Sequence, residues 1–337
     1  MSAPGAPTTT ASLRPVLFLS FAGFCTMATM RVADPLLPEV ATDFSTTAGH
    51  ASIITTSFAL AYGLFQVVFG PLGDRWGKYR VITLALGVAA IIVAATATSQ
   101  SLATLANLRF AAGAVTAAVI PLSIAYIGDI TPYEQRQPVL ARYMTGTVLG
   151  LLFGQVAGGV IMEYAGWRAV FLALAVAYVL VTLCLLFELR SNRVAHHVAP
   201  ASIHPMRVIV RYRDVIRAAH PRRVLIAVFL EGAMLYGGIA YLGAYLRATF
   251  ALDYDVIGLL LAGFGVGGLI YTLFSRPIIR RLGEHGMVRT GAVCILIGYL
   301  SMAMLTDWRL FIVPNLLMGF GFFLFHNTLQ TNATQMA

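Results

Sequence analysis

The sequence has few charged residues and few cysteines, and these shortages limit what the protein can be. Charged residues make up 11% of the 337 residues, whereas a typical soluble domain has about a quarter. The three cysteines, Cys25, Cys184 and Cys294, lie inside apolar runs and have neither metal-ligand spacing nor a pairing pattern. No serine–histidine–aspartate grouping or glycine-rich phosphate loop stands out. The sequence therefore argues against an enzyme and predicts no metal site and no cofactor.

Hydrophobic residues, in contrast, make up 58% of the chain, more than a soluble fold of this length could bury, so a lipid bilayer must be part of its solvent. The net charge of +9 does not indicate nucleic-acid binding here, because the charges lie between apolar runs. These runs do not alternate as the strands of a membrane barrel would. They predict an all-α membrane protein with ten spans, at residues 15–34, 51–72, 80–98, 103–127, 138–162, 168–188, 223–247, 256–275, 289–306 and 310–330.

The basic residues predict the orientation of these spans. If the N-terminus is cytoplasmic, 18 of the 23 lysines and arginines fall in cytoplasmic segments. The positive-inside rule favours that arrangement. We therefore expect a multi-pass protein of the inner (plasma) membrane with a cytoplasmic N-terminus.

The spacing of the runs divides the chain into three parts. Residues 14–188 hold six spans, residues 189–222 form a basic cytoplasmic linker, and residues 223–337 hold four. Apolar residues at helical spacing in the linker predict a short helix on the membrane surface. A basic, glycine-containing loop follows the second span of each half, as parallel six-helix repeats would give.

The segment 70–80, between the second and third spans, contains the most specific motif. Gly70 and Gly73 would let helices approach closely. Asp74 is an acid in a basic loop, where it can pair with a neighbouring cation or lie against a helix N-terminus. Such contacts can break and re-form as two bundles move, although a plain basic turn is the alternative interpretation. The candidate latch comprises Gly70, Gly73, Asp74, Arg75, Gly77, Lys78 and Arg80.

This motif resembles the loop 2–3 signature of the major facilitator superfamily. The resemblance implies two six-helix bundles and places Asp74 and Arg75 in a latch between them. The family normally has twelve spans, so the resemblance also predicts that this chain lacks the last two helices. A transport-dead remnant or a sensor therefore stays an open alternative.

Arg109 lies inside the fourth apolar run, with Gly113 four residues later. The pair resembles the family's Arg-x-x-x-Gly pattern, which in proton-coupled members is associated with proton transfer. An arginine inside an apolar helix usually faces a polar cavity or an acid. The alternative is an arginine that extends to the outer interface, about 10 Å away.

The fifth run carries Gly150, Gly154, Gly158 and Gly159, in a stretch that resembles a motif of drug:proton antiporters. Gln155 stands where that motif has proline. The glycines predict close helix packing, and ordinary small-residue packing is the alternative to an antiporter role.

Arg31 and Asp34 lie three residues apart at the end of the first run, so both can project from one helix face. The run of residues 34–38 resembles the acid and proline pattern of the drug-efflux branch. Arg31, Asp34 and Arg109 are expected at similar depth, as a charged cluster at an outer cavity. An interfacial turn is the alternative.

In the second half, Glu231 is the one carboxylate within the apolar runs. An intramembrane acid is by default a candidate functional residue, although it could also extend to the inner interface. His326 and Asn327 make the end of the tenth run polar, so they either line the pathway or mark its exit.

Together these features predict a proton-coupled transporter that exports a small amphipathic molecule by alternating access. A sugar or metabolite transporter of the same superfamily is the alternative substrate assignment. The expected partners are the small-molecule substrate, protons and the lipid bilayer, with no nucleic acid. The chain is expected to be a monomer driven by a proton gradient.

Overall fold

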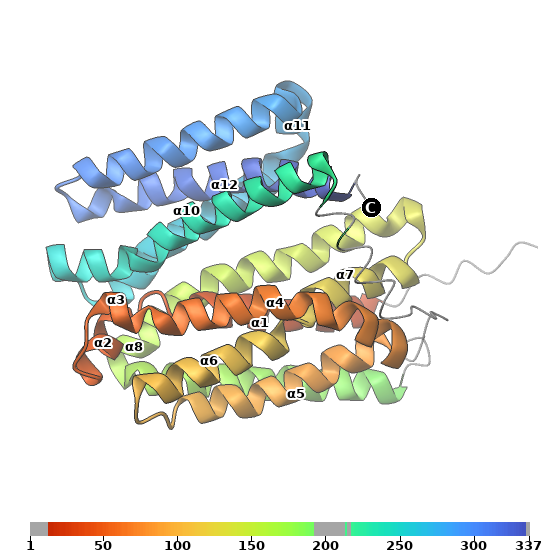
Figure 1. Cartoon of the computed structure of the whole chain (residues 1–337), viewed down its shortest axis with the longest axis horizontal. Helices are drawn as coiled ribbons and strands as arrows, with labels where there is room; N and C mark the ends of the chain where they lie inside the picture. The colour runs from red at the N-terminus through yellow and green to blue at the C-terminus, as the bar shows by residue number, and fades with distance from the viewer. Residues whose placement is uncertain (1–12, 192–212, 214–216, 335–337) are drawn as a thin grey trace, which may run out of the picture.

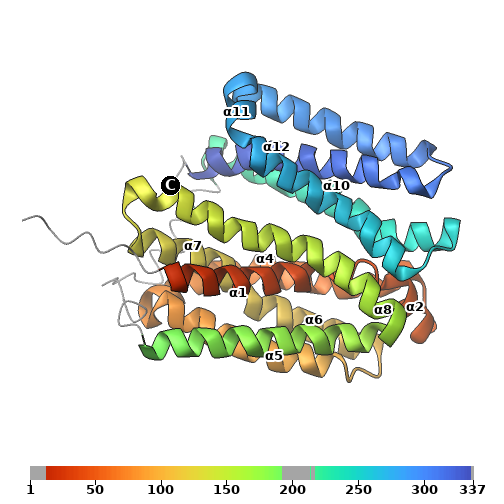
Figure 2. The same cartoon turned by 180° about the vertical axis from the view of Figure 1, so that it is seen from behind.

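The computed structural model describes residues 13–191, 213 and 217–334, and every regular element in these ranges is a helix. Figures 1 and 2 show the helices in two layers, with the chain from α1 to α8 in one and α10 to α12 in the other. We call these the first and the second bundle. In chain order the elements are α1 (Leu13–Arg31), α2 (Leu37–Asp43), α3 (Ala48–Ala51), α4 (Ile53–Trp76), α5 (Lys78–Thr96), α6 (Leu102–Thr116), α7 (Val119–Ile130), α8 (Tyr133–Ser191), α10 (Ala219–Phe250), α11 (Tyr254–Met304), the 3-10 helix η2 (Trp308–Phe311) and α12 (Ile312–Thr334).

Two of these helices reverse direction at a single glycine. Gly166 in α8 has φ 79° and Gly283 in α11 has φ 60°, values that L residues with a side chain rarely adopt. The elements are 59 and 51 residues long, so each is long enough to cross a bilayer of about 30 Å twice. The sequence predicts loops at both places, whereas the structure makes each turn at one residue.

The reversals define the two ends of the molecule. The turn between α4 and α5, which contains Gly77, lies at the same end of the molecule as the reversal within α11, and the reversal within α8 lies at the opposite end (Figures 1 and 2). We call them the Gly77 end and the Gly166 end.

Seven helices in the described part are long and apolar enough to span a membrane. Two of them contain the reversals, while α1 is not among the seven. The total of ten crossings stays a prediction.

Two predicted spans are interrupted. The first ends at Arg31, where residues 32–36 form a turn before α2, because Pro35 and Pro38 cannot supply the backbone N–H that a helix interior needs. The fourth divides at Ala117–Ala118 into α6 and α7. These breaks leave backbone and side-chain polar groups at membrane depth, where they require partners inside the protein.

Side chains cap three helix starts at the Gly166 end. Thr47 accepts from His50 N at 3.2 Å, and Ser101 accepts from Thr104 N at 3.2 Å. Asp307 accepts from Arg309 N at 3.0 Å at the start of η2. These caps satisfy backbone donors that a helix start leaves free.

The glycines of α8 let three helices meet closely. A Cβ at Gly154 would lie 2.6 Å from Ala28 O of α1, and one at Gly150 would collide with the Phe24 backbone. Gly158 faces Val32, while Gly159 faces α11, with Gly258 Cα 3.0 Å from its ideal Cβ position. The predicted close packing is confirmed, and it joins both bundles.

The outer surface of the helices is apolar. Leu183 of α8 is 57% exposed, Ile91 of α5 72% and Leu273 of α11 77%. Exposure of so many large apolar side chains to water would be unfavourable, whereas lipid is a suitable solvent for them. The predicted surface helix in the linker, with Met206, Val210 and Ile216, lies outside the described residues.

Candidate functional site

A cavity of about 650 Å³ lies between the two bundles. Most of its walls are apolar or aromatic, with polar groups concentrated on α11 and α12. It extends to Glu284, beside the reversal at Gly283. The lining residues are Met27, Ile120, Met144, Thr147, Val148 and Leu151 from the first bundle, and Tyr236, Tyr271, Thr272, Ser275, Ile279, Glu284, Met287, Phe322, Phe323, His326, Asn327 and Thr328 from the second.

Glu231 and His326 form an ion-pair contact beside this cavity. His326 Nδ1 lies 3.0 Å from Glu231 Oε2, and the contact is a salt bridge when the histidine is protonated. The Glu231 side chain is 3% exposed and His326 37%. His326 and Asn327 line the cavity, in agreement with the interpretation that they line the pathway. Glu231 contacts His326 and is not among the lining residues.

Arg31 and Asp34 form a second pair, buried between the bundles. Arg31 Nη1 donates to Asp34 Oδ2 at 3.1 Å, and the two side chains are 3% and 0% exposed. Arg31 also stacks on Tyr236 of α10, with its guanidinium carbon 4.1 Å from the ring centroid. The i, i+3 pairing expected from the sequence is therefore present, in a turn that faces the second bundle and not an exposed interface.

Aromatic rings connect the two pairs. Tyr236, on whose ring Arg31 stacks, contacts Phe322 with 5.5 Å between ring centroids. Phe322 stacks in turn on His326 at 4.9 Å and 23°. The Asp34 and Glu231 carboxylates are thus the two ends of one continuous series of side-chain contacts. The middle of that series, Tyr236, Phe322 and His326, forms part of the cavity wall.

Arg109 does not complete the charged cluster by a direct ion pair. Its Nη1 donates to Thr29 O at 3.0 Å and its Nε to Ile54 O at 3.2 Å. Its guanidinium carbon lies 4.4 Å from the Phe58 ring centroid, and the side chain is 1% exposed. The alternative of an arginine extending to the interface is thus wrong, because backbone carbonyls and an aromatic face hold the charge inside the first bundle.

The candidate latch lies within the first bundle. Lys78 Nζ contacts Asp74 Oδ1 at 3.4 Å and Asp129 Oδ2, on α7, at 2.5 Å. Of the cations available to Asp74, the structure selects Lys78, while Arg75 and Arg80 are exposed.

The glycines of that segment differ in role. A Cβ at Gly73 would lie 2.5 Å from Leu122 Cδ2, which confirms close packing there. Gly70 has no heavy atom within 4 Å of its ideal Cβ position, so the expected close approach at Gly70 is wrong. Gly77 has φ 89° between α4 and α5, which explains the need for glycine at that position.

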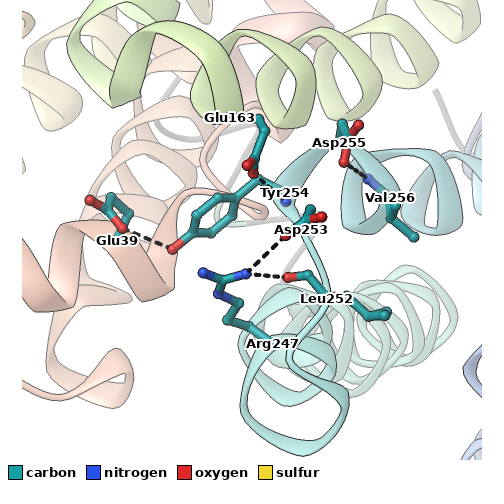
Figure 3. Close-up of polar contacts among 8 residues, drawn as sticks. All are labelled: Glu39, Glu163, Arg247, Leu252, Asp253, Tyr254, Asp255 and Val256. Atoms are coloured by element: carbon teal, nitrogen blue, oxygen red, sulfur yellow. Dashed lines mark hydrogen bonds and ion pairs between the residues drawn. The ribbon is translucent and has the colours of Figure 1, made fainter.

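Polar contacts at the Gly166 end join the two bundles, and sequence reasoning missed them (Figure 3). The Tyr254 hydroxyl donates to Glu39 Oε2 at 3.0 Å, and Tyr254 N donates to Glu163 Oε2 at 2.9 Å. Arg247 lies over the Tyr254 ring at 4.7 Å from its centroid. We call Glu39, Glu163, Arg247 and Tyr254 the clasp. Its members come from three distant parts of the chain, at residues 39, 163 and 247–254, so no local pattern could have indicated it.

Asp43, at the end of α2, is held at the same end by α8. Asp43 Oδ2 accepts hydrogen bonds from Trp167 Nε1 and Arg168 Nη1, both at 2.9 Å. The Trp167 hydrogen bond has the largest effect and lowers the pKa of Asp43. Burial, the next largest effect, opposes it, and the hydrogen bond and charge of Arg168 lower the pKa further, so that it lies below its ordinary value. These contacts tie the Gly166 reversal to α2.

Comparison with known proteins gives one family and a consistent fold. Residues 19–337 match the family described as "Major Facilitator Superfamily". YybF and YceJ, named as uncharacterized MFS-type transporters of Bacillus subtilis (strain 168), are each 26% identical, over 69% and 86% of this chain. "Efflux pump radE" of Floropilus chiversii is 24% identical over 79% of this chain. The matched region spans 56%, 71% and 54% of these three relatives.

The fold also resembles a solved structure. A bacterial homolog of the human lysosomal transporter Spinster, in an inward-facing and unoccupied conformation, superposes with a TM-score of 0.70. It is 18% identical, and the match covers 98% of this chain and 76% of that one. At this identity the likeness concerns the fold alone.

Proposed function

This chain belongs to the Major Facilitator Superfamily, a family of transporters and not of enzymes, and we propose that it is a secondary active transporter that exports a small amphipathic molecule in exchange for protons. The cavity between the bundles carries this proposal. Its walls come from both bundles and are mainly apolar. Two buried carboxylates, Asp34 and Glu231, pair with Arg31 and His326, which contact or form part of the wall. An amphipathic molecule fits such walls, and the carboxylates provide places for a proton.

Each pair can couple proton binding to a change in contact. A proton on Asp34 removes the negative charge that holds Arg31 at 3.1 Å. A proton taken up by Glu231 has the same effect on its contact with His326. Since Arg31 rests on Tyr236 and His326 on Phe322, a change in either pair moves a wall of the cavity.

The contacts between the bundles support access from the Gly77 end. At the Gly166 end the bundles are joined by the clasp and by a 2.7 Å hydrogen bond between Ser52 and Tyr241. The cavity instead reaches Glu284, near Gly283. With the basic loops on the cytoplasmic side, this arrangement faces inward, and alternating access requires the clasp to open.

Flux measurements in proteoliposomes test the proposal. The full chain is reconstituted and an outward-directed gradient of an amphipathic fluorescent dye is combined with an imposed pH gradient. Dye should leave faster when protons can enter in exchange, and protons should enter with it. Asp34→Asn and Glu231→Gln should each abolish the dependence on the pH gradient.

Asp307→Asn provides the matched control, because Asp307 is an exposed carboxylate outside the cavity and asparagine can also cap η2. It should retain full coupling. A rate of dye export by the wild-type chain that does not depend on the pH gradient would contradict proton exchange. Coupled flux that survives both cavity variants would remove these carboxylates from the mechanism.

A further inference from the structure

Five polar atoms of Arg31, Asp34 and Gln155 are buried without a hydrogen-bond partner among the described residues. They are Arg31 Nε and Nη2, Asp34 Oδ1, and both amide atoms of Gln155. The side chains are 3%, 0% and 0% exposed. A buried polar group without a partner is costly, so a cluster of five such atoms calls for an explanation.

The cluster lies where the two bundles meet, next to the cavity. Gln155 of α8 faces the Asp34 carboxylate without an aligned hydrogen bond. From the second bundle, Tyr236 covers Arg31, and a Cβ at Gly243 would lie 2.9 Å from Asp34 O. Tyr236 also lines the cavity, so a molecule there is separated from the cluster by one aromatic side chain.

We propose that Arg31, Asp34 and Gln155 form a subsite for the polar head of the transported molecule, and that this head is uncharged or zwitterionic with an oxygen acceptor beside an O–H or N–H donor. The inference rests on the proposed function only in treating the ligand as cargo. Tyr236 would shift aside to admit the head, while the rest of the ligand stays against the apolar cavity wall.

The free atoms determine this hydrogen-bonding pattern. Arg31 Nη1 is used by Asp34, which leaves the Nε–Nη2 edge of the guanidinium as a planar donor fork for oxygen. Asp34 Oδ1 accepts from a hydroxyl or an N–H. Gln155 adds one donor group and one acceptor beside them.

The charges around the cluster determine the net charge of the head. Arg31 already pairs with Asp34, and the charge of Arg109 also acts on that carboxylate. A cationic head would add a positive charge to a buried region that already contains two arginines for one aspartate, and a quaternary ammonium would leave the Arg31 fork unpaired. A head with adjacent acceptor and donor, in contrast, satisfies the free atoms without adding net charge.

Three probes with the same tail separate these possibilities. N-octanoylethanolamine has a carbonyl acceptor and a hydroxyl donor, octyltrimethylammonium has a positive charge and no donor, and octanesulfonate has a negative charge. Binding to the purified full chain in lipid nanodiscs is measured by calorimetry, and empty nanodiscs correct for partitioning into lipid. The neutral probe should bind at least about tenfold more tightly than octyltrimethylammonium. It should also bind more tightly than octanesulfonate, which can use the Arg31 fork but has no donor for Asp34 Oδ1.

Gln155→Leu removes both amide atoms at similar size and should weaken the neutral probe about tenfold, with little effect on the ions. Gln135→Leu, on the same helix but exposed, is the matched control and should bind as wild type. Arg31→Lys keeps the charge and loses the fork, so it should weaken the neutral probe as well. Thermal unfolding shows whether each variant is folded.

Equal binding of the neutral probe by folded wild type and Gln155→Leu would overturn the inference, as would tightest binding of octyltrimethylammonium by the wild type. If Gln155→Leu does not fold, equal binding by Arg31→Lys and wild type overturns it. These outcomes are independent of transport. Head-group selectivity without proton-coupled flux would contradict the proposed function alone, whereas coupled flux with unselective binding would contradict the subsite alone.

Discussion

The Tyr254 hydroxyl of α11 donates a 3.0 Å hydrogen bond to Glu39 Oε2 of α2, so a residue of the second bundle is tied to one 215 positions earlier in the first. The same tyrosine donates its backbone N–H to Glu163 of α8. One residue thus holds two segments of the opposite bundle, which makes it the point at which separation of the Gly166 end can be tested (Figure 3).

We expect Tyr254→Phe to loosen the Gly166 end. The ring stays in contact with Arg247, while the hydrogen bond to Glu39 is lost and the Glu39 carboxylate loses that donor. Spin labels at Gln100→Cys and Asp307→Cys, exposed positions on opposite bundles at this end, report the separation by pulsed electron resonance after Cys25, Cys184 and Cys294 are replaced by alanine.

Longer distances should gain population in Tyr254→Phe. Tyr164→Phe is the matched control, because Tyr164 is 79% exposed and lies outside the clasp. An unchanged distance distribution in Tyr254→Phe would show that the hydrogen bond does not hold the bundles together.

Gly154→Ala should destabilise the protein, because its new Cβ would lie 2.6 Å from Ala28 O, a backbone atom of α1 that cannot rotate away. The expected loss of stability is about 1–3 kcal/mol, typical of overpacking. Gly63→Ala in α4 serves as the control, since no heavy atom lies within 4 Å of that Cβ position. There alanine should be neutral or slightly stabilising.

Thermal unfolding in one detergent measures both glycine variants. If Gly154→Ala melts at or above the wild-type temperature, α1 and α8 can separate without cost, and the close packing seen here has no energetic importance.

The contacts of Asp43 predict a pH-dependent contribution to stability. Its pKa is lower in the folded chain than the ordinary value of 3.8, so the ionised form stabilises the fold at pH values above 3.8. The contribution disappears as the pH falls through the lowered pKa of the folded state. Asp43→Asn should therefore lower the melting temperature at neutral pH, and the difference from wild type should shrink with acidification below pH 3.8.

Asp307→Asn, an exposed capping acid, serves as the comparison for the general effect of acid on the detergent-solubilised chain. A difference between Asp43→Asn and wild type that stays constant with pH would contradict a role for the Asp43 charge.

The sequence allows the helical fold to be predicted because hydrophobicity along a membrane helix is a local property. It also predicts the Arg31–Asp34 pair, since three residues of spacing place both on one face even across a helix end. The break itself follows from Pro35 and Pro38, yet its consequence does not: whether an acid after a helix faces lipid headgroups or a neighbouring bundle depends on packing between bundles.

Contacts between distant segments are beyond such reasoning. Glu231 and His326 are 95 residues apart and meet only because α10 and α12 are neighbours. The sequence marks Gln155 only as the residue in place of a proline, whereas its burial against Asp34 follows from the glycines on either side of it, which bring α8 onto α1. The polarity of these residues marks them as candidates, whereas their pairing requires the fold.

Lys78 has two carboxylate partners that differ in distance and in the helix from which they come. Asp129 of α7 is 2.5 Å from Lys78 Nζ, and Asp74 of α4 is 3.4 Å away, so the contact between helices is the closer one. Asp129→Asn should therefore destabilise the first bundle more than Asp74→Asn does. Both effects should stay within about 1 kcal/mol, because the carboxylates are partly exposed and screened. Thermal unfolding at low and high salt measures the comparison, and the difference between the variants should decrease with salt. If Asp74→Asn is the more damaging of the two, Asp74 has a partner stronger than Lys78, which would support the interpretation of the 70–80 segment as a latch against another part of the protein.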